Sequence, residues 1–324
     1  MNKIKIGIIG ATGYAAQELT ALLVQSSYVK IIFLQSASAA GKKSPHLDQI
    51  YENIDLVEMV NRKPDVVFFA TPHGIAMKDA PYFLENNIKV IDLSGDFRFY
   101  DPLIFEKAYN MSHLTPQLKG VFGLTEIFYK QIKSANLIAN PGCYVTACLL
   151  ALFPLQSQFD RAVLDAKSGY SGAGKNFSDH ERLKNNTIIP YKLKSHRHQV
   201  EIQQFFKVPI HFSPHIIDRF RGIEVTIHVQ IKFEYCNNNF LEIFQNFYKN
   251  NDYIQVQSEI PLIEKVENTN KAILGAFEFD EQGRLIIVAV LDNLRKGAAS
   301  QAMQNLYCLF DIKDKIPDSL IILK

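Results

Sequence analysis

The sequence has few cysteines, no long apolar run and little net charge, and each of these absences excludes a class of protein. The four cysteines form no Cys-x-x-Cys pair and no metal-binding spacing, so we expect neither a disulfide framework nor a metal site. No apolar run approaches the roughly 18 residues of a membrane-spanning helix. The formal net charge of +2 gives no reason to expect nucleic acid or a membrane as the main partner.

The length and the N-terminus indicate a two-domain cytoplasmic protein. With 324 residues, of which 47% are hydrophobic, the chain can bury a large core and divide into two domains. The first residues run directly into a predicted strand and show no signal peptide, so we expect a cytoplasmic location. A reducing cytoplasm would also keep cysteine thiols available for reaction.

A glycine-rich turn near the N-terminus predicts a dinucleotide-binding domain. Residues 3–9 are rich in β-branched residues and predict a buried strand, which runs into a turn with Gly7, Gly10 and Gly13. A helix is predicted to follow over residues 14–25. In this arrangement the backbone can approach a pyrophosphate, which then rests on the helix N-terminus. The alternative is a tight turn that binds no ligand.

The end of the second predicted strand, residues 29–34, favours NADP(H) as the dinucleotide. Sites selective for NAD usually carry an acidic residue about 20 residues beyond the glycines, to bind the ribose 2′-hydroxyl. This chain has Ser36, Ser38 and Lys42 there, an environment that suits a 2′-phosphate. The alternative is that Lys42 and its neighbour Lys43 belong to a solvated loop.

Two further predicted strands, residues 65–70 and 89–93, also end in polar or glycine-rich loops. Ligands bind at the carboxyl ends of the strands in an open parallel sheet, so these loops are candidate site loops. The second loop carries Arg98, whose guanidinium could bind a phosphate or a carboxylate. An ion pair with Asp96 or Asp101 is the alternative.

Cys143 is the candidate nucleophile. A short predicted strand, residues 137–139, leads into the sequence NPGCYVT, and a helix is predicted over residues 145–153. A thiol at a helix start faces unpaired N–H groups and the positive end of the helix dipole, which stabilise the reactive thiolate. Asn140 is a plausible cap of this helix, and Gly142 permits a tight backbone approach. The alternative is a small buried hydrophobic residue, as most free cysteines are.

The C-terminal half has a different pattern. A strand is predicted over residues 162–168, followed by a glycine-rich loop over 169–175 that could line a ligand. Long alternating runs over 223–233 and 285–291 predict a mostly antiparallel sheet covered by helices. The segment 292–310 predicts a long amphipathic helix.

Two histidines, His196 and His198, are the acid/base candidates. They precede a helix predicted over residues 200–206, and a histidine near a reactive cysteine can transfer a proton at neutral pH. No carboxylate or cysteine cluster completes a metal site with them. The alternative is a pair of surface histidines near a helix start.

These pieces occur in an order that resembles the N-acetyl-gamma-glutamyl-phosphate reductases of the aspartate-semialdehyde dehydrogenase superfamily. The similar stretches span the chain: GIIGATGYAAQEL at 7–19, ATPHG at 70–74, DLSGDFR at 92–98, VFGLTE at 121–126, NPGCYVT at 140–146, SGYSGAGK at 168–175, HRHQVE at 196–201, FSPHIIDRFRG at 212–222 and DNLRKGAASQA at 292–302. The chain departs from the family pattern at a few positions. Ala15 and Ala16 replace Thr-Gly, Val145 and Val200 replace prolines, and Ala37 replaces an arginine.

The resemblance implies a fold and a division into domains. It implies a Rossmann-type doubly wound sheet followed by an α+β domain with a mostly antiparallel sheet. The NADP-binding domain would be residues 1–142, completed by a C-terminal helix over residues 294–324. The catalytic, substrate-binding and dimerisation domain would be residues 143–293.

The resemblance also implies a set of site residues. Cys143 would be the nucleophile, with His198 or His196 as the acid/base; we favour His198, because it lies one helical turn before Glu201, which could orient it. The cofactor would be bound by Gly10, Thr12, Gly13, Tyr14, Ala15, Ser36, Ser38, Lys42, Pro72, Ser171, Gly172 and Asn293. The substrate would be bound by Arg98, Asn140, Ser168, Tyr170, Arg197 and Glu201.

The implied reaction is the NADPH-dependent reduction of N-acetyl-gamma-glutamyl phosphate to N-acetylglutamate 5-semialdehyde and phosphate through a cysteine thioester, in arginine biosynthesis. The implied assembly is a homodimer or homotetramer. Three alternatives stay open: an aspartate-semialdehyde dehydrogenase, a reductase of a related acyl phosphate on a carrier protein, and a non-catalytic nucleotide sensor of the same fold. A sensor would not need a reactive Cys143, and a carrier-bound substrate would favour a basic rim that the sequence does not suggest.

Overall fold

The structure is a computed structural model that describes residues 3–175 and 187–317. The chain folds into two units, one formed by residues 1–141 with 298–324 and the other by residues 142–297. The first unit is therefore completed by a segment that returns from the C-terminal end of the chain. The resemblance implies crossings at residues 143 and 294, whereas the two units divide at residues 142 and 298. The last part of the returning segment, 318–324, lies outside the described residues.

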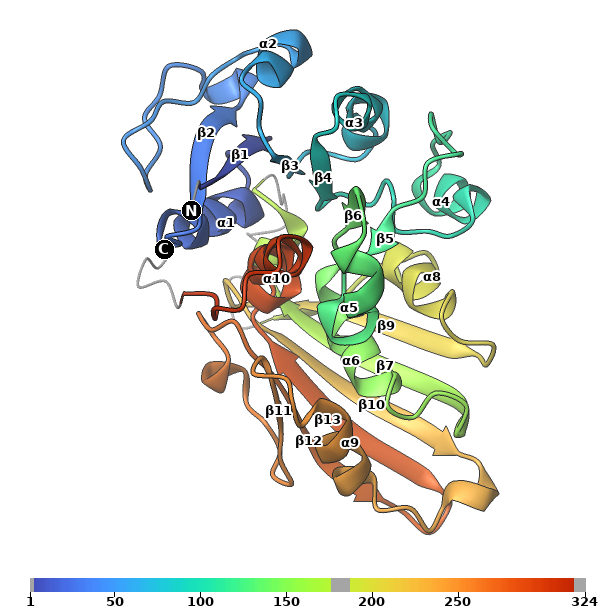
Figure 1. Ribbon diagram of the computed structural model, residues 1–324. Helices are drawn as coiled ribbons and strands as arrows, with labels where there is room; N and C mark the ends of the chain where they lie inside the picture. The colour runs from blue at the N-terminus through green and yellow to red at the C-terminus, as the bar shows by residue number, and fades with distance from the viewer. Residues whose placement is uncertain (1–2, 176–186, 318–324) are drawn as a thin grey trace. The chain divides into compact units, whose positions relative to one another are not determined.

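The first unit is built on a six-stranded parallel sheet with the strand order β2-β1-β3-β4-β6-β5 (Figure 1). The strands are β1 Ile4–Ile9, β2 Val29–Gln35, β3 Val66–Phe69, β4 Lys89–Asp92, β5 Val121–Phe122 and β6 Leu137–Ala139. The helices are α1 Tyr14–Val24, α2 Leu56–Asn61, α3 Ile75–Glu85, α4 Pro102–Tyr109, α5 Thr125–Lys133 and α10 Ser300–Leu309, with a short 3-10 turn at Ala37–Ala39. Because the chain proceeds from β1 outward to β2 and then crosses to β3, the prediction of a Rossmann-type sheet is confirmed.

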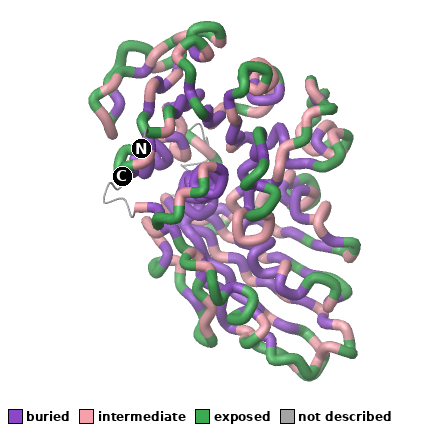
Figure 2. Tube along the Cα trace, in the orientation of Figure 1, coloured by how far each residue is buried: buried purple, intermediate pink, exposed green. Residues whose placement is uncertain are grey.

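Helix α10 differs from its prediction as a long amphipathic helix over residues 292–310. The chain instead makes a π-helical turn at Arg295–Ala299, and all ten residues of α10 are buried (Figure 2). Several polar side chains of α10 bond to neighbouring elements of the first unit. Gln301 Nε2 donates to the carbonyl oxygen of Gly123 at 3.0 Å, and Asn305 Nδ2 donates to the same oxygen at 2.8 Å. The polar periodicity that suggested a solvated face therefore marks internal hydrogen bonds.

The second unit is built on a seven-stranded mixed sheet with the strand order β11-β12-β13-β10-β7-β9-β8. The strands are β7 Phe159–Gly169, β8 Ile188–Pro190, β9 Ile210–Ile217, β10 Ile223–Ile231, β11 Ile254–Val256, β12 Ala272–Phe279 and β13 Arg284–Leu291. The pairs β7–β9 and β11–β12 are parallel and the other four pairs are antiparallel, which confirms the prediction of a mostly antiparallel sheet.

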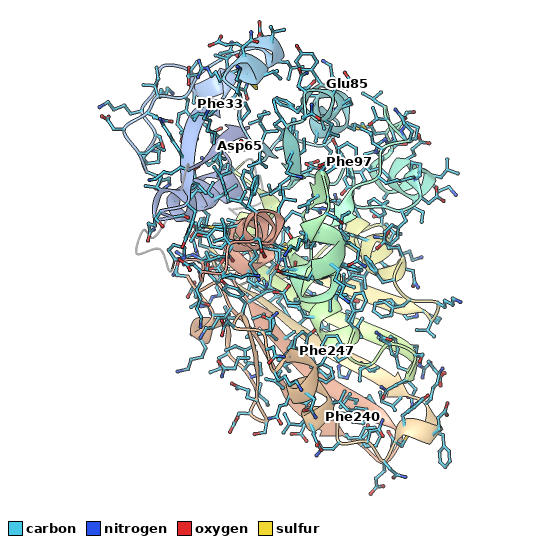
Figure 3. All side chains as sticks on the ribbon, viewed as in Figure 1. Phe33, Asp65, Glu85, Phe97, Phe240 and Phe247 are labelled. Atoms are coloured by element: carbon cyan, nitrogen blue, oxygen red, sulfur yellow. The ribbon has the colours of Figure 1, made fainter. Side chains whose placement is uncertain are left out.

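Helices cover this second sheet through apolar stripes. They are α6 Cys143–Leu152, which packs on β10 and β13, α8 Arg197–Gln203, which packs on β9, and α9 Phe240–Tyr248, which packs on β11. Helix α9 shows the pattern plainly, because Phe240 and Phe244 are buried whereas Phe247 is 43% exposed (Figure 3). Short 3-10 turns occur at Tyr170–Ala173, Phe233–Tyr235 and Ile263–Lys265.

Candidate active site

The turn between β1 and α1 has the shape of a phosphate cradle. Gly10 has a φ of +77°, and a Cβ there would lie 2.7 Å from the carbonyl oxygen of Ala70, so only glycine fits. A Cβ built on Gly13 would meet no heavy atom within 4 Å, so the space above the start of α1 is open. Gly13 is the N-cap of α1 and supplies no side-chain cap, which leaves the first helical N–H groups available to an anion. The residues present fit the pyrophosphate of a dinucleotide.

Three hydroxyl groups form a row beside this cradle. Thr12 Oγ1 lies 3.5 Å from Ser36 Oγ, which lies 3.4 Å from Ser38 Oγ. Lys42 is exposed on the loop that follows and forms no ion pair with any residue that the structure describes. Its neighbour Lys43 pairs with Asp48 at 3.2 Å. The two lysines are thus not equivalent, and Lys42 is the one that can accept a new anionic partner.

Arg98 braces the loop that leads to the cysteine. Its Nε donates to the carbonyl oxygen of Asn140 and its second terminal nitrogen donates to that of Leu93, both at 2.7 Å. The side chain is only 7% exposed. The carboxylates of Asp96 and Asp101 accept backbone N–H groups at the starts of α3 and α4. Arg98 therefore holds the backbone of the β4 and β6 loops.

Asn140 does not cap the cysteine helix, so this prediction is wrong. Its Nδ2 donates to the carbonyl oxygen of Ala298 at 3.2 Å, and its Oδ1 accepts from Asn305 at 3.0 Å. The cap residue is Gly142, which supplies no side-chain bond. Asn140 is 1% exposed, so in the first unit it fastens the loop after β6 to the returning segment.

Cys143 is the first residue of α6 rather than a residue that precedes it. The helix begins directly after Gly142, whose backbone is extended, so it starts two residues earlier than predicted. The Cys143 side chain is half-buried and projects from a turn whose N–H groups have no intrahelical acceptor. This end of the helix dipole stabilises a thiolate.

The other three cysteines lack this environment. Cys148 is completely buried in α6, and burial raises its pKa well above the usual range for a thiol. Burial also raises the pKa of Cys308 to about 11. Cys236 is half-buried and donates to the carbonyl oxygen of Lys232. Within the described residues, Cys143 is the cysteine at the start of a helix.

His198 and Glu201 both meet the residue that precedes Cys143. A Cβ built on Gly142 would lie 2.4 Å from Nε2 of His198, so the imidazole rests directly on the glycine backbone. The Gly142 N–H donates to Oε1 of Glu201 at 2.9 Å. Glu201 is 0% exposed. Helix α8 therefore fixes the cap of α6 and holds the His198 ring next to the cysteine turn.

His196 has a different place from His198. It caps α8, which begins at Arg197 and not at residue 200 as predicted, because Nδ1 of His196 accepts the N–H of His198 at 3.2 Å. Its Nε2 therefore carries the proton and faces the hydroxyl of Tyr191 at 3.2 Å. Burial, together with the charges of Arg197 and Lys192, lowers the pKa of His196 to about 3. His196 is thus neutral at physiological pH.

Two tyrosines that the sequence did not single out complete this part of the site. Burial raises the pKa of Tyr191 to about 12 and raises that of Tyr144 well above the usual range for a phenol, and the negative charge of Cys143 contributes to both shifts. Both phenols therefore lie close enough to Cys143 to sense its charge. The Tyr144 hydroxyl donates to the carbonyl oxygen of His215 at 2.8 Å. Tyr144 follows the cysteine in the sequence motif, whereas nothing in the sequence around Tyr191 marked it.

Gly297 is a further residue that sequence reasoning missed. A Cβ at this position would lie 2.8 Å from Cβ of Cys143, so the π-helical turn at Arg295–Ala299 presses its backbone against the cysteine. The signal was present as a glycine in the stretch DNLRKGAA, but its partner was not deducible from the sequence.

A second cluster in the same unit shapes the loop after β7. Asn293 Nδ2 donates to Ser171 Oγ at 2.9 Å, and Asn293 Oδ1 accepts the Gly222 N–H at 2.7 Å. A Cβ on Gly172 would lie 3.0 Å from Ser168 Oγ. The structure therefore brings together four of the residues predicted in the glycine-rich loop and at the end of β13. Asn293 is 2% exposed and acts here as a clamp on the loop.

The remaining predicted residues lie at element starts and on loops. Tyr14 and Ala15 are the first two residues of α1, and Pro72 is exposed on the loop after β3. Tyr170 is half-buried in the 3-10 turn after β7, and Arg197 is the half-buried first residue of α8.

Replacing Gly142 by alanine is expected to lower kcat by roughly 10- to 100-fold, because the added methyl group occupies the position of His198 Nε2. Affinity for the dinucleotide should stay unchanged, because the cradle around Gly10 and Gly13 belongs to the other unit. Steady-state kinetics and fluorescence titration with NADPH measure the two effects. A variant with the kcat of the parent protein would contradict the contact between Gly142 and His198.

No helix in the described part of the chain is long and apolar enough to cross a membrane. Among the same residues, no group of three or more histidine, cysteine or acidic side chains is arranged to hold a metal ion.

The fold and the site define the class of the protein. Residues 5–135 match the model of the semialdehyde dehydrogenase NAD binding domain, and residues 143–293 match that of the semialdehyde dehydrogenase dimerisation domain. The solved structure of aspartate semialdehyde dehydrogenase II from Vibrio cholerae aligns over 97% of this chain and 100% of that one, with a TM-score of 0.75 at 19% identity. At that identity the structural likeness concerns the fold alone.

Curated relatives identify the family within this class. The chain is 38% identical to the N-acetyl-gamma-glutamyl-phosphate reductase of Methanosphaera stadtmanae over 327 residues, which cover 96% of both chains. It is 39% identical to that of Clostridium novyi over 347 residues, which cover 98% of this chain and 100% of the relative. The chain belongs to the N-acetyl-gamma-glutamyl-phosphate reductase family.

Proposed function

We propose that this protein reduces N-acetyl-gamma-glutamyl phosphate to N-acetylglutamate 5-semialdehyde and phosphate, as a step of arginine biosynthesis. The observation that carries the proposal is the start of α6, where Cys143 follows a glycine that contacts both His198 and Glu201. The full-length similarity to reductases of that name supports the choice of substrate.

The first step is acyl transfer to the thiol. The Cys143 thiolate attacks the carbonyl carbon of the acyl phosphate, a C–S bond forms, and the C–O bond to phosphate breaks. Inorganic phosphate leaves and a thioester remains. The N–H groups at the start of α6 stabilise the negative charge on the carbonyl oxygen during this attack.

The second step reduces the thioester. NADPH supplies a hydride when it is bound. The thioester carbon becomes that of a thiohemiacetal, whose oxygen takes a proton from His198. As the C–S bond breaks, the aldehyde forms, the thiolate of Cys143 returns and the hydroxyl proton goes back to His198.

His198 suits the role of acid/base better than His196 does. His196 is committed by both ring nitrogens, one to the N–H of His198 and the other to Tyr191, and its low pKa keeps it neutral. We assign His196 to positioning α8 and the Tyr191 hydroxyl. Glu201 and Asn140, predicted to bind substrate, are both buried. Glu201 accepts the N–H of Gly142 and Asn140 bonds to Ala298 of the returning segment, so we assign both to positioning as well.

The substrate is held by the remaining candidates. We assign the phosphate to Arg98, because a guanidinium on the loop after β4 has the charge and the planar donor geometry that suit a phosphate. Arg197 at the start of α8 is the cation that suits the substrate carboxylate. We assign the acyl chain to Ser168, near the end of β7, and to Tyr170 in the 3-10 turn that follows.

We assign NADPH rather than NADH as the reductant. The hydroxyls of Thr12, Ser36 and Ser38 and the exposed Lys42 offer donors and a positive charge to a 2′-phosphate, and none of these residues is acidic.

Replacing Lys42 by alanine is expected to lower kcat/KM for NADPH by about tenfold, the size of one charge-assisted hydrogen bond. The value for NADH should stay unchanged, because NADH lacks the 2′-phosphate. Lys43→Ala is the matched control, since Lys43 already pairs with Asp48. Equal losses with both cofactors would refute the assignment of Lys42.

The proposed assembly is a homodimer or a homotetramer, built through the second unit, which matches the dimerisation domain model. We assign cofactor binding to the first unit and catalysis to the second. A thioester mechanism needs a free thiol, which favours a reducing compartment such as the cytoplasm.

The direct test is phosphate-dependent reduction of NADP. N-acetylglutamate semialdehyde should support it with a kcat/KM at least about a hundredfold above that for aspartate semialdehyde, because the latter carries a charged ammonium group in place of the acetamido group and is one methylene shorter. A preference for aspartate semialdehyde would replace the proposed function by that of the structurally similar dehydrogenases.

A further inference from the structure

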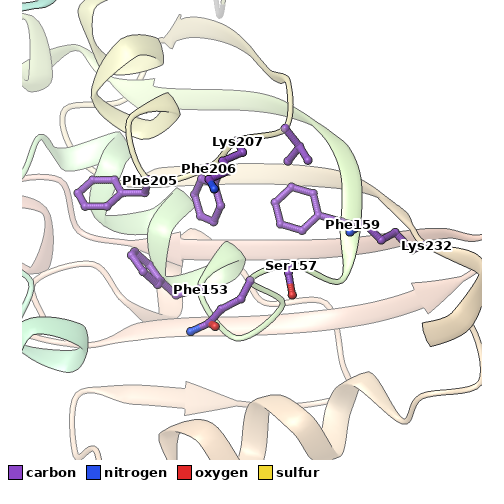
Figure 4. A pocket seen from close by; sticks show the side chains of 9 residues that line it. Phe153, Ser157, Phe159, Phe205, Phe206, Lys207 and Lys232 are labelled. Atoms are coloured by element: carbon purple, nitrogen blue, oxygen red, sulfur yellow. The ribbon is translucent and has the colours of Figure 1, made fainter.

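The second unit contains an aromatic pocket of about 380 Å³ that the proposed reaction does not use. Four phenyl rings line it, and two lysines and a few polar residues surround them (Figure 4). The lining residues are Phe153, Gln156, Ser157, Phe159, Phe205, Phe206, Lys207, Val208 and Lys232. We call this the aromatic pocket. Its volume is large enough for the side chain of an aromatic residue.

Three hydrogen bonds of the Gln203 side chain fix the backbone that forms one wall of the aromatic pocket. Gln203 Nε2 donates to the carbonyl oxygens of Phe206 and Val208 at 2.8 and 2.9 Å, and its Oε1 accepts the N–H of Ile210 at 3.0 Å. The rings of Phe153 and Phe206 are 5.7 Å apart and tilted by 55°, so their faces are not stacked on each other. An apolar wall that is fixed in this way can receive a further ring by edge-to-face contact.

A fully exposed phenylalanine stands at the margin of this pocket. Phe233 is 93% exposed and directly follows Lys232, which lines the pocket. The segment is anchored to the pocket wall, because the Lys232 N–H donates to the carbonyl oxygen of Gln158 at 2.9 Å. Asn238 also bonds to the side chain of Gln158 at 3.1 Å. Phe233 is therefore presented to solvent on a fixed turn.

The charges around the two features are complementary. Glu234 follows Phe233 and is exposed, whereas Lys207 and Lys232 line the pocket and no acidic residue does. Lys207, Lys232 and Glu234 form no ion pair with any residue in the described ranges 3–175 and 187–317. An apolar ring followed by an acid thus matches an apolar pocket with a basic rim.

We propose that Phe233 of one copy of this chain inserts into the aromatic pocket of a second copy, with Glu234 placed against Lys207. A projection and a pocket that lie side by side on one chain meet reciprocally when two copies are related by a two-fold axis. A reciprocal contact of this kind is complete in a dimer and does not extend into a longer chain of copies. The contact is too small to hold a dimer alone, so it adds to a larger interface of the second unit.

Sedimentation analysis over a range of concentrations tests this contact. Phe233→Ala should raise the dissociation constant of the assembly by about tenfold or more, as expected for an aromatic side chain seated in a pocket. Val208→Trp, which fills the pocket without removing a contact, should have a similar effect. Lys249→Glu, an exposed charge change on α9, is the control. Circular dichroism confirms that each variant is folded.

Charge-reversal variants of the two residues give a second and more specific test of the contact. Glu234→Lys and Lys207→Glu should each weaken association, and the double variant should recover most of the loss. Unchanged association in the Phe233 and Val208 variants would overturn the proposal. So would loss of association in the Phe233 variant alone, since the pocket would then have another occupant.

Photocrosslinking detects the contact between position 233 and the aromatic pocket directly, even if the assembly does not dissociate at measurable concentrations. A benzoylphenylalanine at position 233 should give a covalent dimer on a denaturing gel, with the crosslink mapped by mass spectrometry to residues 153–159 or 205–208. A crosslink only to other peptides, or no covalent dimer, would contradict the proposal. Neither readout depends on catalytic activity.

Discussion

Replacing Cys143 by serine is expected to lower aldehyde oxidation by at least about 10⁴-fold, to the limit of detection. A serine hydroxyl at the start of α6 is far less acidic and less nucleophilic than a thiol, and it cannot form the thioester from which hydride transfer proceeds. The affinity for NADPH should stay unchanged, because the cradle at Gly10 and Gly13 lies in the first unit. Stopped-flow kinetics and fluorescence titration measure the two quantities.

Cys236→Ser is the matched control for this variant. Cys236 is half-buried like Cys143, but it lies on the turn after β10 and donates to a backbone carbonyl oxygen, which a serine hydroxyl can also do. Its turnover should match that of the parent protein. Iodoacetamide should inactivate the parent and the Cys236 variant at the same rate, with substrate protecting both. Appreciable turnover by Cys143→Ser would contradict a mechanism in which Cys143 forms a covalent thioester.

Replacing His198 by asparagine is expected to lower kcat by about 10²- to 10⁴-fold, the range of general acid/base catalysis. Asparagine keeps a polar group against Gly142 but cannot exchange a proton near neutral pH. The KM for the aldehyde should change far less than kcat. The limb of the pH–rate profile that reports the acid/base group should also disappear.

His196→Asn is the comparison that separates the two histidines. Asparagine is among the best N-cap residues, so it can keep the bond to the N–H of His198. We expect a loss of kcat of about tenfold or less and a pH–rate profile of unchanged shape, since His196 does not titrate near neutral pH. A larger loss in the His196 variant than in the His198 variant would reverse the assignment.

Much of the fold was predictable because its signals are local. The parallel strands β1, β2, β4 and β6 fall within a residue or two of their expected ranges, since short apolar runs bounded by glycine or polar residues mark buried strands. The antiparallel strand β13 also begins within one residue of its expected start. The family resemblance supplied the domain types, and the two family models confirm them.

The helix starts were less predictable, because they depend on long-range hydrogen bonds. Helix α6 begins at Cys143 with its cap glycine bonded to Glu201, which is 59 residues away in the sequence. Helix α8 begins at Arg197 because a histidine, an uncommon cap residue, accepts the N–H of His198, the second residue of the helix. The full burial of α10 likewise follows from partners on distant loops.

The site residues also divide into those that local sequence identifies and those that depend on neighbours distant in sequence. Cys143 and the histidine pair were identifiable from residue type and motif. The contacts of Gly142 and Gly297 were not, because the reason for each glycine is a neighbour distant in sequence. Tyr191 was missed for the same reason, since its role depends on the burial and hydrogen bond that only the folded unit provides.

The central claim, that Cys143 carries the acyl group, is tested most directly by a single-turnover reaction without phosphate. N-acetylglutamate semialdehyde and NADP should give a burst of one NADPH per chain and then stop, because no phosphate is present to release the thioester. Mass spectrometry should find the N-acetylglutamyl group on the peptide that contains Cys143, and added phosphate should restart turnover. Steady turnover without phosphate, or an acyl group on a different residue, would contradict the account.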